Sequence, residues 1–404
     1  MTTRAAVPRF GFVMEQVLGH VTHYQTLRRM VDQRADVNSH WVEVTYRGES
    51  LTERLRLAPA AVRGTFRGFQ QVRAGVRGRQ LDALYFHTQK PAVFSWDLLA
   101  RIPTVLSLDV TPKQYDSLGE FYDHKPDGDN AIASFKHWMN RRTFALARTV
   151  VVWSTWVTGS LVKDYGVPEE KIKVIPPGVD LEQWVEPEEP RTAGRLPRVL
   201  FVGGDFSRKG GDLLLDWFRQ TGRGRCELDL VTRSPLVPEA GVSVYGNVLP
   251  NSTLAKRLFF GADVFVMPSR GECFGIAQIE AMAAGLPVVA TRVGGSPDIV
   301  SEGDTGFLIE PNDGRALGAA LDVLLADDAR RRAMGRRGRS KAERLFDAEQ
   351  NAQAVVGCLE DAAQTMRPVA EQPQQGDLSR VSATQLHLNG EKTGVRPRLG
   401  KLRP

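Results

Sequence analysis

Short apolar runs, often β-branched, alternate with longer amphipathic segments through most of the chain. Polar or glycine-rich turns follow the runs, and the longer segments repeat apolar residues at the spacing of helices. Such alternation predicts an α/β fold with parallel, doubly wound sheets. The predicted strands comprise residues 9–14, 41–46, 81–87, 104–108, 149–153, 172–175, 198–202, 227–231, 242–245, 263–267, 288–291 and 306–309.

The alternation is interrupted by a Pro-Pro-Gly sequence at residues 176–178 and by the acidic, proline-rich stretch 182–197. This break predicts a first domain over residues 1–180 and a second over 181–347. Residues 367–404 are polar, contain proline and glycine and show no hydrophobic period. We therefore predict that they form a disordered basic tail.

The net charge of the 404-residue chain is +6 at pH 7. The tail holds seven Lys/Arg and three Asp/Glu, so it contributes +4 and leaves +2 for the rest. A nearly balanced body does not require a nucleic acid partner. The three cysteines are far apart, and we find neither a signal-peptide core nor an apolar run near the roughly 18 residues that span a bilayer. These features predict a cytoplasmic protein.

The stretch 267–295 combines a strand, a tight turn and a helix. Pro268 and Gly271 end the apolar run, and a helical pattern starts near Phe274. The backbone N–H groups of the residues at the start of that helix would lack partners within the helix and could bind an anion or a hydroxyl oxygen. The turn is therefore a candidate ligand cradle.

Two carboxylates flank this cradle, Glu272 before the helix and Glu280 within it. One interpretation makes Glu272 a capping residue favoured by the helix dipole and Glu280 a solvated or paired group. The other makes both face a ligand. The residues around Glu280 are mostly Ala, Ile and Met, so its carboxylate needs a partner.

The two glutamates, separated by seven residues and followed by AMAAGLPVVAT and VGGSPDIV, resemble the donor-binding region of retaining GT-B glycosyltransferases of family 4, also described as group 1. The resemblance continues through IPPGVD at 175–180 and FVGGDFSRKGG at 201–211. It implies two Rossmann-like domains facing a central cleft, with the helix 348–366 crossing back to the first domain.

The resemblance also implies roles for residues of the second domain. Glu280 would bind the donor ribose and Glu272 the sugar hydroxyls. Arg208 and Lys209 would bind the diphosphate. Gly204 stands where the family usually has arginine, so we expect Arg208 to take over that role. The predicted donor site comprises Gly203, Gly204, Arg208, Lys209, Asn247, Val248, Cys273, Phe274, Gly275 and Glu280, with the nucleobase beside Asn247 and Val248.

The first domain offers candidates for the cleft and the acceptor. Asp109 follows a predicted strand, where open α/β sheets place ligands. Many family members have histidine at this position, so the aspartate is a departure, and we treat Asp109 as a catalytic candidate that acts as an acceptor or base residue. The other predicted catalytic residues are Glu272 and Lys209 of the second domain. Isolated histidines are otherwise more often surface or packing residues. The cleft candidates are Gly19, His20, His87 and Tyr115, the last in a predicted loop over residues 111–130.

Two further patterns have alternative interpretations. Residues 51–79 form an Arg-rich amphipathic segment that could lie on a membrane at its inner face, although four glycines favour a packed helix with a basic solvent face. Residues 127–129 have the D-x-D form of metal-dependent glycosyltransferases but follow no apolar strand. We therefore predict a solvated turn and no metal site.

These observations predict a metal-independent enzyme without a cofactor that transfers a sugar from a nucleotide-sugar, with retention and an α-linked product. The acceptor could be a polysaccharide, a lipid or a small metabolite. A non-catalytic sugar-nucleotide binder and a nucleotide-sugar epimerase remain alternatives. A dinucleotide dehydrogenase is disfavoured because Gly203 and Gly204 lack the complete G-x-G-x-x-G pattern.

Overall fold

The computed structural model describes residues 6–17, 19–47, 60–122, 124–128, 130–185 and 194–365. The predicted tail, part of the predicted domain break and the first residues of the Arg-rich segment therefore lie outside the described residues, as does Asp129 of the D-x-D pattern.

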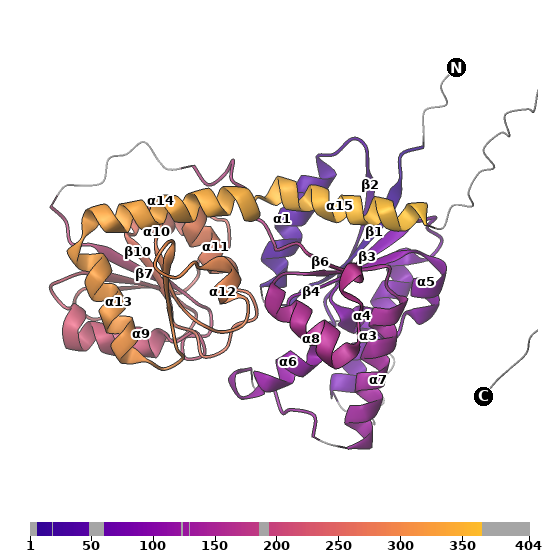
Figure 1. The fold of residues 1–404 in the computed structure, drawn as a ribbon, viewed down its shortest axis with the longest axis horizontal. Helices are drawn as coiled ribbons and strands as arrows, with labels where there is room; N and C mark the ends of the chain where they lie inside the picture. The colour runs from indigo at the N-terminus through magenta and orange to yellow at the C-terminus, as the bar shows by residue number, and fades with distance from the viewer. Residues whose placement is uncertain are drawn as a thin grey trace, which may run out of the picture. The chain divides into compact units, whose positions relative to one another are not determined.

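The first sheet consists of six parallel strands in the order β2-β1-β3-β4-β5-β6 (Figure 1). Along β1, Phe10, Phe12 and Met14 contact one hydrophobic core, whereas Val13 contacts the core on the opposite face. The strands are β1 (Arg9–Glu15), β2 (Asn38–Val44), β3 (Ala83–His87), β4 (Thr104–Leu108), β5 (Thr149–Val152) and β6 (Ile172–Val174).

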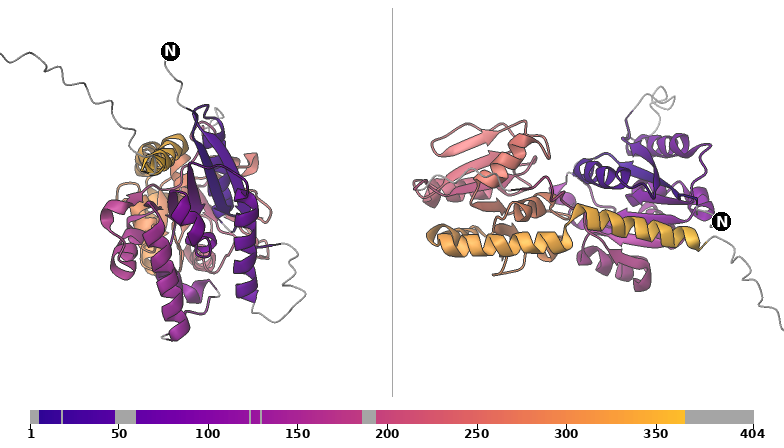
Figure 2. Two further views of the ribbon diagram at one scale, coloured as in Figure 1. Left: turned by 90° about the vertical axis from the view of Figure 1, so that its right-hand side faces the viewer. Right: turned by 90° about the horizontal axis from the view of Figure 1, so that it is seen from above.

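Helices cover both faces of this sheet. The face of Phe12 packs against α1 (His20–Asp32) and α15 (Ala348–Gln364), the yellow helix beside the strands in Figures 1 and 2. The predicted return of the last helix to the first sheet is therefore confirmed. The other face packs against α3 (Ala60–Val76), α4 (Gln89–Ala92), α5 (Trp96–Arg101), α7 (Ala131–Leu146) and α8 (Thr155–Tyr165).

The second sheet repeats this plan with six parallel strands in the order β12-β11-β10-β7-β8-β9. The strands are β7 (Arg198–Val202), β8 (Glu227–Val231), β9 (Val242–Tyr245), β10 (Val264–Met267), β11 (Val288–Thr291) and β12 (Gly306–Ile309). One face packs against α10 (Thr253–Gly261), α11 (Ile276–Ala283) and α12 (Ser296–Ile299), and the other against α9 (Gly211–Trp217) and α13 (Gly314–Ala326). Helix α14 (Asp328–Leu345) leads into α15.

The described part of the Arg-rich segment is a packed helix. Val72 and Val76 of α3 are buried. A β-carbon on Gly68 would overlap Tyr46 just after β2, and one on Gly75 would overlap Val42 within β2. The glycines thus permit close packing on the sheet. Among the described helices, none is both long and apolar enough to cross a bilayer.

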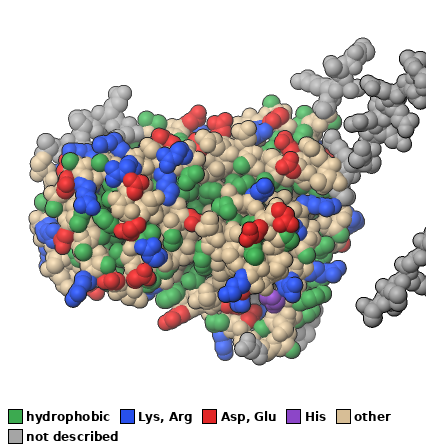
Figure 3. Space-filling view, viewed as in Figure 1, with side chains coloured by type: hydrophobic (Ala, Val, Ile, Leu, Met, Phe, Trp, Pro, Cys, Tyr) green, Lys and Arg blue, Asp and Glu red, His purple; other side chains and the backbone are tan. Residues whose placement is uncertain are grey.

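Basic and acidic side chains are interspersed on the face shown in Figure 3. Several surface arginines pair with carboxylates, for example Arg225 with Asp322 at 2.7 Å. The described surface thus agrees with the balanced charge that the sequence predicts outside the tail.

The prediction of a loop over residues 111–130 is wrong for residues 112–121, which are mostly helical. They contain α6 (Pro112–Ser117) and a 3-10 turn at Gly119–Phe121. Thr111 and Gln114 form a capping box, with proline at the first helical position. This Thr-Pro-x-Gln pattern is a helix-start signal that could have been recognised in the sequence.

We expect Leu359→Ala in α15 to lower the free energy of unfolding by about 2–5 kcal/mol, because the side chain is fully buried against the first sheet. Urea unfolding followed by circular dichroism would measure the loss. Gln353→Ala, at an exposed position of the same helix, is the matched control and should change little. Equal effects of both substitutions would contradict this packing.

Candidate functional site

Most predicted site residues lie at the carboxyl ends of strands where the chain direction diverges. In the first sheet, α1 leaves β1 on one face and α4 leaves β3 on the other. In the second sheet, α9 and α11 leave the neighbouring strands β7 and β10 on opposite faces. Such switch points leave a crevice between diverging loops, which is where open α/β sheets bind ligands.

Lys209 and Glu272 form a buried ion pair at the switch point of the second sheet. Their side chains are 15% and 8% exposed. Lys209 precedes Gly210, which has a φ of +75°, and a β-carbon there would overlap the carbonyl oxygen of Pro268. Glycine is therefore required for the turn after β7 to contact the turn after β10, and this contact brings the ion pair together.

Arg208 connects this pair to the first half of the chain. Its Nη1 donates hydrogen bonds to the carbonyl of Gly271 at 2.9 Å and to the hydroxyl of Tyr122 at 3.1 Å. The guanidinium carbon lies 4.4 Å from the centre of the Tyr122 ring. Arg208 Nε donates to Asp205 at 3.2 Å. Arg208, which the sequence predicts to bind the diphosphate, is thus held in place by Gly271, Tyr122 and Asp205. Of these three partners only Asp205 is charged.

The helix after β10 begins later than predicted, at Ile276. Cys273, Phe274 and Gly275 form the turn before it, and Gly275 has a φ of +94°. The ring of Phe274 packs in the core, 5.8 Å from that of Trp153. No acceptor within the described ranges binds the backbone N–H groups of Cys273, Phe274 or Gly275. The cradle is therefore a turn whose backbone N–H groups have no partner among the described residues.

Glu280 is half-buried on α11. Burial raises the pKa of its carboxyl group to about 8. At neutral pH the group is therefore largely protonated and can both donate and accept a hydrogen bond. The sequence analysis expects a partner for the Glu280 carboxylate. In the portions of the chain that the structure describes, no cation forms an ion pair with Glu280, so these residues do not supply that partner.

His20, at the start of α1, lies between two carboxylates at the switch point of the first sheet. Its Nε2 is 3.4 Å from Asp109 Oδ2 and its Nδ1 is 3.6 Å from Glu15 Oε2. Burial alone would lower the pKa of His20, but the two carboxylates, chiefly Asp109, raise it to about 10. His20 is therefore an imidazolium at neutral pH. The Thr88 hydroxyl donates to Glu15 at 2.8 Å and completes this cluster across β1 and β3.

His87 and His23 are neutral neighbours of this cation. His87 is fully buried and stacks on Trp153, with ring centres 5.1 Å apart. Burial, together with the charge of His20, lowers the pKa of His87 well below its usual range and that of His23 to about 3. The structure places His87 as a packing group beneath His20.

The two clusters are close to each other in the compact unit of the chain. A β-carbon on Gly19 would lie 3.9 Å from Ile276 at the start of α11. Tyr115 lies 5.3 Å from Tyr122 between ring centres. Burial is the main cause that raises the pKa of Tyr115, and the nearby Cys273 raises it further. Predicted residues from both halves of the sequence, among them Gly19, Tyr115 and Arg208, thus lie close to one another.

Comparison with known proteins identifies the family of the chain. Residues 196–327 match the family described as glycosyl transferases group 1, and residues 18–183 match glycosyltransferase family 4. The chain belongs to glycosyltransferase family 4. A D-inositol 3-phosphate glycosyltransferase of Segniliparus rotundus is 34% identical over 209 residues, which are 46% of each chain. That of Corynebacterium efficiens is 31% identical over 287 residues, 64% of this chain and 66% of the relative.

The family 4 chain spans about half the length of the first of these relatives. Among solved structures, sucrose-phosphate synthase of Thermosynechococcus elongatus has a TM-score of 0.70 and 20% identity, with 89% of this chain and all of that chain covered. This likeness shows the fold, which is GT-B as the sequence predicts.

Four predicted donor residues of the family 4 chain lie at the same sheet edge but make no side-chain bond to the ion pair. Gly203 packs against Lys209 and donates its N–H to Val231. Gly204 is exposed after β7. Asn247 is exposed after β9, and the adjacent Val248 packs on the core. Because β8 separates β9 from β7, the nucleobase role of these last two residues stays a prediction.

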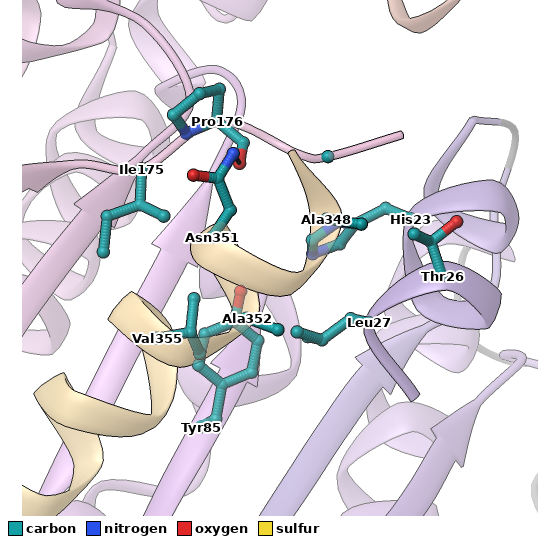
Figure 4. Close-up of a pocket in the computed structure, with 11 residues that line it drawn as sticks. His23, Thr26, Leu27, Tyr85, Ile175, Pro176, Ala348, Asn351, Ala352 and Val355 are labelled. Carbon is teal, nitrogen blue, oxygen red and sulfur yellow. Dashed lines mark hydrogen bonds between the residues drawn. The ribbon is translucent and has the colours of Figure 1, made fainter. Parts of the chain in front are cut away.

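Two hollows occur in the described part of the family 4 chain. One, between α1 and α15, has a volume of about 10 Å³, room for about one water beside His23 (Figure 4). The other, of about 320 Å³, is lined by Arg9, His40 and Arg79 at the amino ends of β1 and β2. Neither hollow coincides with a switch point.

Among the described residues, the D-x-D pattern at 127–129 forms no group of side chains that could hold a metal ion. Asp127 pairs with Lys136 at 2.6 Å, and Asp129 is not among the described residues. No group of three metal-binding side chains occurs in the described ranges.

Sequence reasoning assigned no individual role to three residues that build the site: Glu15, Tyr122, which lies in the predicted loop over residues 111–130, and Trp153. Glu15 is the last residue of the apolar strand β1, so its position at a carboxyl end was a usable signal. Tyr122 and Trp153 act through contacts with residues far away in the chain, Arg208 and His87. Nothing in their local sequence indicates these partners.

We expect His20 to make stability depend on pH. The pKa of His20 in the folded chain, about 10, exceeds the unfolded value of about 6.5, so its contribution is complete below about pH 6.5 and is lost as the pH rises towards 10. Urea unfolding between these limits should show a loss on the order of a few kcal/mol in the wild type and less in His20→Gln. His137→Gln, a half-buried control on α7, should retain the wild-type profile. Parallel curves for wild type and His20→Gln would contradict the expectation.

Proposed function

We propose that the protein transfers a sugar from a nucleotide-sugar donor to an acceptor hydroxyl, with retention at the anomeric carbon and without a metal. The observation that carries the proposal is the buried Lys209–Glu272 pair, with Arg208 beside it, at a sheet switch point in a chain of glycosyltransferase family 4. Family membership supports the donor class, and the chemistry of the residues supports their roles.

In this proposal the donor diphosphate lies against Arg208, Lys209 and the free N–H groups of the turn before α11. Cations and backbone donors suit phosphate oxygens. Glu272 orients the sugar hydroxyls by accepting hydrogen bonds from them, and its pairing with Lys209 holds the side chain in place. The half-buried Glu280 binds the ribose hydroxyls, which provide the hydrogen-bond partners that its carboxyl group requires.

The reaction breaks the bond between the anomeric carbon and the diphosphate oxygen, and the acceptor oxygen forms the new bond from the same side. Negative charge then develops on the departing diphosphate, where fixed positive groups lower the barrier most. The proton of the acceptor hydroxyl passes to a departing phosphate oxygen or to Asp109. His20 holds Asp109 in place and balances its charge before the proton arrives.

The alternatives differ in their products. An epimerase would change the sugar without attaching it to an acceptor, and a non-catalytic binder would leave the donor intact. The acceptor class remains polysaccharide, lipid or small metabolite. Because two relatives are named D-inositol 3-phosphate glycosyltransferases, inositol 3-phosphate belongs in the acceptor panel. The anomeric configuration of any product, read by NMR coupling constants, tests retention.

We expect the purified protein to release nucleotide from one member of a panel of UDP-, GDP- and ADP-sugars with EDTA present. Glu272→Ala and Lys209→Ala should each reduce the rate at least about 100-fold, because each leaves the other charge unpaired and removes a ligand contact. Lys173→Ala, at an exposed position of β6, should have no effect. Loss of activity in EDTA that returns with added Mg²⁺ or Mn²⁺ would contradict the metal-independent mechanism.

We also propose peripheral contact with an anionic membrane, through α7 rather than α3. Ile132, Phe135 and Trp138 are 68%, 57% and 49% exposed, and their spacing of three residues places them along one side of α7. The helix carries Lys136, Arg141 and Arg142 but no Asp or Glu. Exposed aromatic and aliphatic residues beside cations are typical of helices that lie at a membrane interface. A cytoplasmic location accords with this proposal.

Sedimentation with vesicles of phosphatidylglycerol and phosphatidylcholine tests this contact. We expect the wild type to bind the anionic vesicles, and Phe135→Ser combined with Trp138→Ser to weaken binding at least about 10-fold. Val237→Ser, at a residue that is 86% exposed in the second half of the chain, is the control. Equal binding of all three proteins, or preference for neutral vesicles, would contradict the proposal.

A further inference from the structure

Arg233 lies at the end of β8, beside the predicted phosphate turn. The turns after β7 and β8 are joined, because Gly203 N–H donates to the carbonyl of Val231 at 2.9 Å. Thr232 N–H donates in turn to Tyr245 at 3.1 Å, which fixes the backbone that carries Arg233. The arginine therefore projects from an anchored position at the same sheet edge as Lys209.

The guanidinium of Arg233 occupies the space above Gly204. A β-carbon on Gly204 would lie 2.9 Å from Nη2 and 3.2 Å from Nε of Arg233. Any larger residue at this position would have to displace the arginine. The guanidinium of Arg233, which follows β8, thus occupies the volume that a side chain at position 204 would fill.

Arg233 also differs from its basic neighbours in its pairing. Lys209 pairs with Glu272, and Arg208 binds Asp205 together with Tyr122 and Gly271. Arg233 is exposed, and we find no carboxylate or carbonyl bound to it among the described residues. The structure therefore holds a free guanidinium against the backbone of the turn.

Arg233 gives the turn after β7 and its neighbours a net positive charge. Arg208 and Lys209 contribute two positive charges, and Asp205 and Glu272 contribute two negative charges. Without Arg233, the turn would present no net positive charge to a diphosphate. A guanidinium presents paired N–H donors that match phosphate oxygens, so an unpaired arginine gives the turn the charge that it lacks.

We propose that Arg233 binds the diphosphate of the nucleotide-sugar, in the space that Gly204 leaves open. This inference rests on the proposed function for the identity of the ligand, and it changes the role expected of Arg208. Arg208 is already committed to Asp205 and Tyr122, so Arg233 rather than Arg208 takes the place of an arginine at position 204.

The test compares Arg233→Gln and Arg233→Lys with the wild type in binding and turnover. Calorimetry with UDP, GDP and ADP identifies the nucleotide that binds, and inorganic pyrophosphate and the matching nucleoside are then titrated. We expect Arg233→Gln to weaken binding of the nucleoside diphosphate and of pyrophosphate by about 10- to 100-fold and to leave the nucleoside unchanged. Arg233→Lys should recover part of the loss. Arg257→Gln, an exposed arginine on α10, is the matched control and should bind as the wild type does.

A charge swap provides the second measurement. Gly204→Arg combined with Arg233→Gly moves the guanidinium to the neighbouring turn, and we expect it to restore most of the diphosphate affinity that Arg233→Gly alone loses. Failure of the swap to restore affinity, with an unchanged thermal midpoint, would overturn the assignment. So would equal weakening of nucleoside and diphosphate binding in Arg233→Gln, which would indicate a structural role only.

These results remain distinguishable from failure of the proposed function. If no donor is consumed by the wild type but Arg233→Gln still loses diphosphate affinity, the transferase proposal fails while Arg233 stands as a diphosphate ligand. If the wild type transfers sugar and Arg233→Gln keeps both its KM and its diphosphate affinity, the proposal for Arg233 is wrong. Should Arg233→Gln not fold, Arg233→Lys and the swap carry the test.

Discussion

The buried ion pair between Lys209 and Glu272 is the interaction on which the candidate site depends. Each charge would be costly to bury alone, and removal of one partner from such a pair typically costs about 3–5 kcal/mol. The pair exists only because Gly210 lets two turns touch at the switch point of the second sheet. Its position therefore follows from strand order and from one glycine, rather than from the two residues themselves.

At the first sheet, too, a buried cation is stabilised by carboxylates, but the cation is a histidine. His20 lies between Glu15 and Asp109, which keep the imidazole protonated in spite of its burial. Both clusters hold a cation by carboxylates at a switch point. In the first cluster, however, one positive charge faces two carboxylates, whereas the second places two cations and Arg233 beside two carboxylates. This difference suits an anionic donor at the second sheet and a hydroxyl acceptor at the first.

Contacts between residues far apart in sequence connect the two clusters. Tyr122 binds Arg208, and Trp153 packs on Phe274. Asp298 accepts a hydrogen bond from the hydroxyl of Thr155 at 2.8 Å and another from its backbone N–H at the start of α8, where the side chain of Ser154 makes no capping bond. The start of α8 is thus completed by a residue of α12. These contacts give the protein a single site built from both sheets.

The sequence by itself determined the parallel α/β plan, because apolar runs at strand length and segments with helical period can be recognised locally. It also determined the family, the two glutamates near α11 and the Arg208–Lys209 pair, which lie within short continuous motifs. It missed α6, although Thr111 and Gln114 carried a capping signal. Only the tertiary structure decided that Lys209 pairs with Glu272, that His20 is charged while His87 is neutral, and that Arg233 fills the space at Gly204. Each of these properties depends on distances between residues on different strands, and on the burial that the assembled sheets impose, so no local pattern in the chain can specify it.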